Sequence, residues 1–410
     1  MFKTLMLCSN YLLIAGLVLA ALGHPGIAQT KRPYRVLYRF QGGSVGDGQY
    51  PFAGLTADSA GDLYGTTSAG GDTGPGIVFK IAPDGTETVL HTFRGPDGGR
   101  PAARLTLDEA GNLYGMTMEG GRGCEVGCGT VFRLAPDGTE TVLHSFRNNR
   151  RDGQHPTSGV IMDAAGNLYG TTPGGGNKGC GLHGCGVVFK IAPDETETLI
   201  HLFGAAGDGA TPSSGLIMDN AGNFYGSAEE GGSAGGGTIF KLAPDGTETE
   251  LYSFRGGSDG ESPSGDLVMD QAGNLYGTTV LGGNGMGCSV NGGCGTVFKL
   301  SPNGTETVLY AFKGGNDGYE PLTGVIADAA GNLYGTTPKG GDPHCGNHQG
   351  CGTVFQIAPD GTETLLYAFF KNHQGRDPFA GLVADKNGNL FGTTVGGGDR
   401  FGTVFEVGRQ

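Results

Sequence analysis

Tryptophan is absent from this chain of 410 residues, and basic residues are scarce. Its 26 Lys and Arg residues are outnumbered by 40 Asp and Glu residues, which gives a formal net charge of −14 at pH 7. An excess of negative charge of this size disfavours nucleic acid and anionic membrane surfaces as partners. Sugar-stacking platforms normally need aromatic rings on the surface, so the missing tryptophan also counts against a large platform of this kind.

Long apolar runs are also scarce. One such run, YLLIAGLVLAALG at residues 11–23, is too short to span a bilayer comfortably. It follows Lys3 and precedes the small residues GIA before Gln29, which is the pattern of an export signal cleaved after Ala28. We therefore predict a signal peptide over residues 1–28 and a secreted, periplasmic or cell-surface protein with no stable membrane span after cleavage. A retained membrane anchor is the alternative.

Glycine, in contrast, is abundant, with 84 copies beside 20 prolines. Without periodicity, this composition would be typical of low-complexity sequence. Here the glycines recur in seven segments of the GNLYGTT type, which begin at Gly61, Gly111, Gly166, Gly222, Gly273, Gly331 and Gly388. The spacings are 50, 55, 56, 51, 58 and 57 residues. Periods of this size, built only from short strands, are typical of propeller blades.

Each repeat contains four strand-like runs separated by turns rich in Asp, Asn and Gly. The first three runs occur seven times, whereas the fourth occurs six times in line, because the chain stops soon after GTVFEV at 402–407. The segment YRVLYRF at 34–40 supplies the missing copy. We therefore predict an all-β, seven-bladed β-propeller over residues 29–410, whose ring closes when strand 34–40 pairs with the C-terminal blade. The predicted blades span residues 53–93, 102–146, 158–203, 214–254, 265–312, 323–369, and 380–407 plus 34–40.

The repeated motifs also carry a family resemblance. In its GNLYGTT segments, its GTVFRLAPDGTET-type segments and its GG-x-DG-x-x-P linkers, the sequence resembles the GloVer (Gloeo/Verruco) tandem-repeat family of exported bacterial β-propeller-like proteins. The resemblance covers residues 34–407. It implies an exported repeat protein and carries over no catalytic residue.

Several repeated positions are explained by the fold alone. The phenylalanines of the third and fourth strands recur in every blade, and we expect them to pack between blades. His91, His144 and His201 occupy a fourth-strand position that is tyrosine in the other four blades, which predicts a packing position with a polar rim. The Asp that ends each first strand is predicted to cap the following turn.

The variable segments gather on one face. Strands that run alternately up and down place the loops between second and third strands, and the linkers between blades, on one side, here named the loop face. The two short turns of each blade lie on the opposite side, the hairpin face. The loops have 7 or 8 residues in blades one, four and seven and 11 to 15 in the other four.

Every cysteine after residue 28 lies in the four longer loops. An even count, pairwise grouping and an export signal predict four local disulfides. The pairs are Cys124–Cys128, Cys180–Cys185, Cys288–Cys294 and Cys345–Cys351. Metal binding by these thiolates together with nearby loop histidines is the alternative.

The linkers carry a repeated acid at Asp47, Asp97, Asp152, Asp208, Asp259 and Asp317, with Gln374 in the seventh copy. We expect these carboxylates to cap the linker turns, and calcium coordination is the alternative. No other cofactor is expected. The residues left over from packing on the loop face are His155, His183, His344, His348 and His373, with Tyr50 and Tyr319. They are our candidates for a ligand site, against the simpler interpretation of solvated loop residues.

Two functional classes remain open. The first is a non-catalytic, exported binding or scaffold propeller that recognises a protein or a glycan on its loop face. The second is an extracellular polysaccharide-active enzyme, a lyase or hydrolase, with its site at the mouth of the propeller channel. Fold alone does not separate them. The composition favours binding, with a monomer and an unidentified extracellular ligand as the expected assembly.

Overall fold

The computed structural model describes residues 33–408, apart from 44–45, 73, 123, 125–126, 148, 150, 181–182, 205–206, 286–287, 289–291, 346–348 and 371–373. The predicted signal peptide at 1–28 lies outside the described residues. Within the described ranges, no helix has both the length and the apolar character needed to cross a bilayer.

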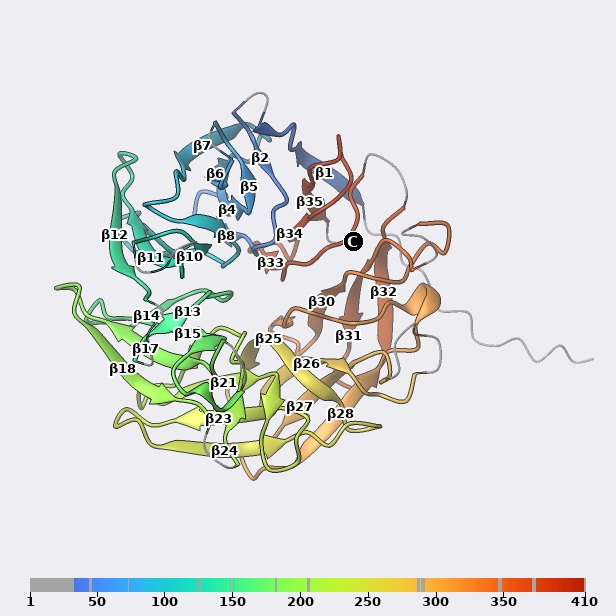
Figure 1. Cartoon of the computed structure of the whole chain (residues 1–410). Helices are drawn as coiled ribbons and strands as arrows, with labels where there is room; N and C mark the ends of the chain where they lie inside the picture. Colours follow the sequence, from blue (N-terminus) through green and yellow to red (C-terminus); the bar gives the residue numbers. More distant parts are fainter. Residues whose placement is uncertain are drawn as a thin grey trace, which may run out of the picture.

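Seven antiparallel sheets follow one another around a common axis in chain order (Figure 1). Alternation of Leu, Val, Ile, Phe and Tyr with smaller residues favours these short strands, and the Gly-rich turns between them favour hairpins. Blade one consists of β3 (Thr56–Ala57), β4 (Leu63–Thr67), β6 (Ile77–Ile81) and β7 (Glu87–Thr92). Blade two consists of β8 (Gly99–Pro101), β9 (Thr106–Leu107), β10 (Leu113–Glu119), β11 (Thr130–Leu134) and β12 (Glu140–Ser145). Blade three consists of β14 (Ile161–Met162), β15 (Leu168–Thr172), β17 (Val187–Ile191) and β18 (Glu197–Leu202).

The remaining blades repeat the same order from the axis outwards. Blade four consists of β20 (Ile217–Met218), β21 (Phe224–Ala228), β23 (Thr238–Leu242) and β24 (Glu248–Ser253). Blade five consists of β25 (Glu261–Met269), β26 (Leu275–Leu281), β27 (Thr296–Leu300) and β28 (Glu306–Ala311). Blade six consists of β29 (Ile326–Ala327), β30 (Leu333–Thr337), β31 (Thr353–Ile357) and β32 (Glu363–Ala368). Blade seven consists of β33 (Val383–Ala384), β34 (Leu390–Thr394), β35 (Thr403–Val407) and β1 (Tyr34–Arg39).

The linkers add short pairings with the loops that follow the second strands. Three two-stranded sheets form in this way, from β2 (Gly48–Gln49) with β5 (Ala69–Gly70), β13 (Gly153–Gln154) with β16 (Gly174–Gly175), and β19 (Gly209–Ala210) with β22 (Glu230–Gly231). The short 3-10 turns η2 (Lys178–Cys180) and η3 (Gly315–Asp317) also lie in these segments. Each of these three linkers is therefore fixed to a loop on the same face of the ring.

The predicted ring closure is confirmed. Strand β1 pairs antiparallel with β35, from Tyr34 opposite Val407 to Arg39 opposite Thr403. In Figure 1 the blue β1 lies beside the red β35. The amide N–H of Phe40 donates to the carbonyl of Gly402 at 3.1 Å, the same bond that Phe93 makes to Gly76 within blade one. The N-terminal strand thus takes the fourth place in a sheet whose other three strands come from the other end of the chain.

The contacts between neighbouring blades, here called seams, share one aromatic pair. At each seam a phenylalanine at the end of a fourth strand meets the third-strand phenylalanine of the next blade edge-on, with ring centroids 5.1 to 5.3 Å apart. The pairs are Phe40–Phe79, Phe93–Phe132, Phe146–Phe189, Phe203–Phe240, Phe254–Phe298, Phe312–Phe355 and Phe369–Phe405. Because these rings are almost completely buried, they form the core that the sequence pattern predicted.

The hairpin face is built from capped turns, also as predicted. In blade three, Asp163 accepts hydrogen bonds from the amides of Ala165 and Asn167 and from the Tyr169 hydroxyl, each at 2.9 Å. Burial alone would raise the pKa of Asp163, but these hydrogen bonds outweigh it and the pKa is lowered. The carboxylate therefore has a structural task that accounts for its presence in every blade.

Candidate functional site at the loop face and channel mouth

Four disulfides stiffen the longer loops, as predicted. The structure joins Cys124 to Cys128, Cys180 to Cys185, Cys288 to Cys294, and Cys345 to Cys351. The second cysteine of each pair is buried and packs into a seam cluster beside a fourth-strand phenylalanine such as Phe203. In blade one, Pro75 occupies the position that Cys185 has in blade three. The disulfides therefore extend the core as well as fixing the loops.

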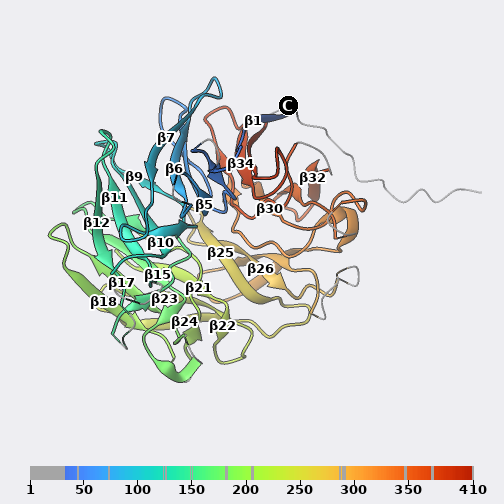
Figure 2. The ribbon, with the colours of Figure 1, turned by 45° about the horizontal axis from the view of Figure 1, so that its top comes forward.

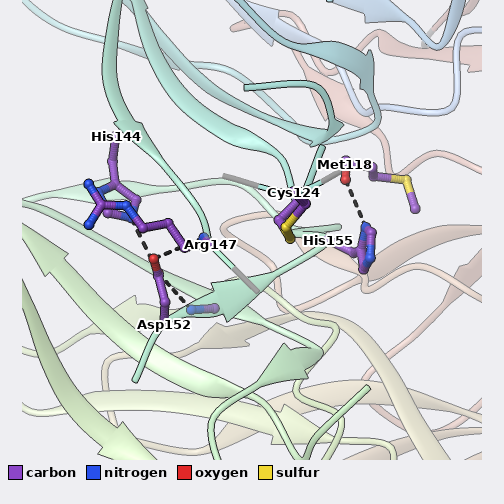
Figure 3. Close-up of a disulfide and its surroundings, with 8 residues drawn as sticks. Met118, Cys124, His144, Arg147, Asp152 and His155 are labelled. Atoms are coloured by element: carbon purple, nitrogen blue, oxygen red, sulfur yellow. Dashed lines mark hydrogen bonds and ion pairs between the residues drawn. A yellow bond between two sulfur atoms is a disulfide. The ribbon is translucent and has the colours of Figure 1, made fainter. Parts of the chain in front are cut away.

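The candidate histidines are placed unequally. His155 and His183 lie together above blade three, with ring centroids 6.2 Å apart. Figure 3 shows His155 pointing to the carbonyl of Met118, and its Nδ1 lies 3.0 Å from that oxygen. His344 is exposed in the loop of blade six. His348 and His373 lie outside the described residues.

The two candidate tyrosines differ from each other. Tyr50 is 37% exposed and its ring centroid lies 6.3 Å from that of Phe401. Tyr319 is only 4% exposed, and the ammonium of Lys339 lies 5.7 Å from its ring centroid. Tyr50 is thus available to a ligand, whereas Tyr319 packs inside the seam between blades five and six.

A ring of strained residues lies on the loop face. In all seven blades the residue before the repeated linker proline has a positive φ, between 50° and 58°. A residue before proline normally avoids this left-handed region, at a cost on the order of 1–3 kcal/mol. The strain is held by hydrogen bonds to the previous blade, as where the amide of His155 donates to Cys128 O at 2.9 Å. The side chains displayed on this uniform backbone all differ: Tyr50, Arg100, His155, Thr211, Ser262, Glu320 and Asp377.

The linker aspartates act as caps. Asp152 accepts from the amide of Arg147 at 3.0 Å and from that of Gly153 at 2.8 Å, and His144 Nε2 lies 3.3 Å from its Oδ1 (Figure 3). Asp47 accepts equivalent bonds from Gln41, Gly48 and the Tyr38 hydroxyl. The histidine-or-tyrosine position of the fourth strand is therefore the partner of the linker acid. Calcium coordination, the alternative role of these carboxylates, stays untested. The backbone donors already use much of the hydrogen-bonding capacity of Asp47 and Asp152.

The axis of the ring is a channel of about 790 Å³, lined by the first strands of all seven blades. The inner position of β25 is visible in Figure 1 and Figure 2. The wall position three residues after the linker proline is glycine in five blades: Gly54, Gly159, Gly215, Gly324 and Gly381. It is Arg104 in blade two and Asp266 in blade five, and both side chains are exposed to the channel.

A third charge lies at the loop-face end of the same channel. Glu229 follows β21, where the other blades have Ser68, Met118, Pro173, Val280, Pro338 or Val395. Its Oε1 accepts from the Ser213 hydroxyl at 2.5 Å and lies 3.5 Å from Ser264 Oγ. Asp266 is also held, since its Oδ1 accepts from the Gly215 amide at 2.7 Å. Blades four and five thus make one wall acidic, and Arg104 lines the same channel from blade two.

Aromatic rings complete the mouth on a third side. Phe52 of blade one and Phe379 of blade seven have centroids 5.6 Å apart, and Phe52 is 37% exposed.

Sequence reasoning missed all five residues of this channel-mouth set, Phe52, Arg104, Glu229, Asp266 and Phe379. The sequence does carry a signal for the three charged residues, because each differs from the residues at the equivalent position of the other blades. Only an alignment of the seven blades reveals it, since these residues are not among the histidines that packing leaves unexplained.

Comparison with known proteins supports the fold and the family. The model of the Gloeobacter/Verrucomicrobia repeat matches residues 27–182, 178–348 and 287–410. Among curated proteins, no relative matches the chain. Among solved structures, the extracellular domain of a hybrid two-component system from B. thetaiotaomicron is similar, with a TM-score of 0.56 and 12% identity over 92% of this chain and 41% of that one. The chain therefore spans about two fifths of the length of these extracellular domains.

A second kind of neighbour is enzyme-like by name. A protein described as a 6-phosphogluconolactonase from Bacteroides fragilis has a TM-score of 0.50 and 18% identity, over 80% of this chain and 86% of that chain. At these identities, likeness shows the propeller fold and nothing about activity.

Proposed function

This chain belongs to the Gloeobacter/Verrucomicrobia repeat family, and we propose that it is an exported, non-catalytic binding propeller with its ligand at the loop-face mouth of the channel. The observation that carries this proposal is the charged break in the repeat. Arg104 and Asp266 replace a glycine that five blades share, and Glu229 is the only acid among its seven equivalents. Packing does not require these charges, because five blades form the same wall without them.

The chemistry of the mouth fits a carbohydrate. Carboxylates such as Glu229 and Asp266 accept hydrogen bonds from sugar hydroxyls, and Arg104 donates to hydroxyls or to an acidic sugar. The ring pair Phe52 and Phe379 offers a small apolar surface for the C–H face of a pyranose. A volume of about 790 Å³ lies within the usual range for small-ligand pockets. The strained ring of varied side chains around the mouth supplies further contacts for a longer glycan.

Export is supported by the four disulfides, since disulfides persist in oxidising compartments. Similarity to the extracellular domains of one-component and two-component systems is compatible with this location. Both points support a ligand that is met outside the cytoplasm.

A glycan array followed by calorimetric titration of the best glycan tests the proposal, with and without calcium. The variants R104G and D266G return each wall position to the residue of five other blades, and E229V copies blades five and seven. We expect each variant to keep the parental Tm within about 2 °C and to weaken binding tenfold or more. A matched control on the hairpin face, Asp137→Asn, should leave affinity unchanged. Binding that survives all three channel variants would place the ligand elsewhere.

A polysaccharide-active enzyme is the second candidate, because Glu229 and Asp266 place two carboxylates in one channel. Glycoside hydrolysis commonly uses such a pair, one as an acid and one as a base or nucleophile. The bound glycan should then be shortened during incubation, and E229Q and D266N should abolish shortening while binding persists. A glycan that is bound and recovered intact supports the non-catalytic proposal.

A further inference from the structure

Six seams bring a second carboxylate to the linker aspartate. It belongs to the glutamate that begins the fourth strand of the following blade: Glu87, Glu140, Glu197, Glu248, Glu306 and Glu363. Burial, and then the neighbouring linker carboxylate, raise the pKa of each to about 7. The Oε1 atom of each is buried and accepts no hydrogen bond from the described part of the chain. These seams therefore hold two acids and too few donors for them.

The seventh seam, between blades six and seven, replaces both acids at once. Gln374 stands in the aspartate position and Tyr34 in the glutamate position. The Tyr34 hydroxyl donates to the Gln374 carbonyl, and the Tyr367 hydroxyl donates to Gln374 Oε1 at 2.6 Å. Tyr34 also stacks on Tyr367 with centroids 3.9 Å apart. The two acids are present together in six seams and replaced together in the seventh. They therefore form one unit, which holds either a bound ion or a shared proton.

Two of the acidic seams add a histidine at ligand distance. His91, Asp97 and Glu140 lie between blades one and two, and His144, Asp152 and Glu197 lie between blades two and three. In each group, one nitrogen and two carboxylate oxygens lie within 4.8 Å of one another. The individual separations include 3.1 Å from His91 Nε2 to Asp97 Oδ2, and 3.3 and 4.0 Å from His144 Nε2 to Asp152 Oδ1 and Glu197 Oε1.

The geometry points to a divalent transition-metal site of the zinc type in each of these two seams. Zinc bonds of about 2.0–2.2 Å place neighbouring tetrahedral ligands about 3.4 Å apart, which the histidine–aspartate separations already approach. At the second of these seams, where His144 Nε2 and Glu197 Oε1 are 4.0 Å apart, the glutamate needs to close by about half an ångström. Its orphan Oε1 supplies the third ligand, and water completes the fourth position.

The ligand set selects the class of ion. Imidazole nitrogen with carboxylate oxygen suits zinc and its neighbours, whereas calcium takes oxygen ligands only. Each aspartate keeps its capping bonds, since its backbone donors leave a lone pair free for the ion.

Zinc uptake by the full chain, prepared without a histidine tag and stripped with EDTA, tests this inference. We expect two zinc ions per chain by equilibrium dialysis, and a Tm that rises by a few degrees with zinc. His91→Tyr and His144→Tyr should each remove one ion, and the double variant should lose the Tm response. Tyrosine is the residue that four other blades use in this position, so these variants are expected to fold normally without zinc.

His201→Tyr is the matched control, because its seam, with Asp208 and Glu248, does not bring the three ligand atoms equally close. It should keep both ions. Zinc that survives the double variant and is lost on His183→Ala would place the metal at the loop histidines and overturn the inference. Absence of zinc binding by the parent would overturn it as well and leave a shared proton as the role of the acid pairs. Neither result bears on glycan binding at the channel mouth.

Discussion

The hairpin face and the loop face are built by the same strands, yet they have different constraints. On the hairpin face, Asp163 and its equivalents make the same three kinds of bond in blade after blade. On the loop face the backbone repeats, down to a positive φ before every linker proline, while the side chains on it change. A residue that makes the same bonds in every blade is accounted for by the fold. Residues that carry function are therefore expected where the backbone repeats but the side chain changes.

The channel wall applies the same comparison at single positions. Gly215 and Gly324 lie so close to Asp266 that an added Cβ would sit 2.7 Å from its Oδ1 and 1.8 Å from its carbonyl oxygen, respectively. Glycine there is a packing requirement. At Gly54 and Gly381, in contrast, an added Cβ would meet no atom closer than 3.5 Å. Arg104 and Asp266 are exposed to the channel, and their charges are therefore available to a ligand.

The largest effect is expected on breaking the repeat at its closure. Deletion of residues 33–40 removes β1, which exposes the edge of β35 and the seam ring Phe405. We expect the Tm to fall by more than about 10 °C, because one sheet loses a strand and two seams lose aromatic contacts. Differential scanning calorimetry measures this directly. A control chain that begins at residue 33 should have the same Tm as the parent. If the deletion variant also has that Tm, the closed ring is refuted.

A second prediction compares two phenylalanines. Phe132 is completely buried at a seam, and Phe132→Ala should destabilise by about 3–5 kcal/mol through lost burial and the cavity left behind. Phe52 is 37% exposed at the channel mouth, and Phe52→Ala should cost less than about 1 kcal/mol while weakening glycan binding. Urea unfolding and titration of both variants separate the two roles. Equal destabilisation would show that the mouth belongs to the core.

A pH dependence is expected from the two seams in which Tyr252 and Tyr310 take the place of the fourth-strand histidine. Burial and a neighbouring aspartate raise the pKa of Glu306 and Glu363 from 4.5 to about 7. A raised folded pKa contributes stability that is fully present below 4.5 and is lost as the pH rises through 7. In EDTA, the Tm should therefore fall by a few degrees between pH 5 and pH 8. The double variant E306Q/E363Q should show a smaller fall of Tm over this range. A fall as large as that of the parent would contradict the burial of these glutamates beside the linker aspartates.

The sequence was sufficient for the fold because a propeller repeats its local rules. Seven GNLYGTT segments fixed the blade count, and the displaced copy at 34–40 fixed the closure. The disulfide partners followed from their short separations. The channel mouth did not follow, because Arg104 and Glu229 are separated by 125 positions in the chain and line the same channel only because the blades form a ring. The loop position of Tyr319 predicts an exposed side chain, but Tyr319 is buried in the cluster that contains Phe312 and Phe355.

The smallest effect on stability is expected from exchanging a loop. Replacing residues 173–185 of blade three by the SAGGDTGP segment of blade one (68–75) removes the Cys180–Cys185 disulfide and His183. Loss of the disulfide costs at most about 2 kcal/mol, and the shorter loop, with Pro75 in the place of Cys185, offsets part of this. We expect a Tm within about 3 °C of the parent and glycan affinity reduced at least fivefold, because the segment beside His155 loses its fixed shape. The disulfide-only variant C180S/C185S separates shape from side chain: it should weaken binding less than the exchange does. If the exchange unfolds the protein, this loop belongs with the repeated core, and if affinity is unchanged, blade three is not part of the ligand site.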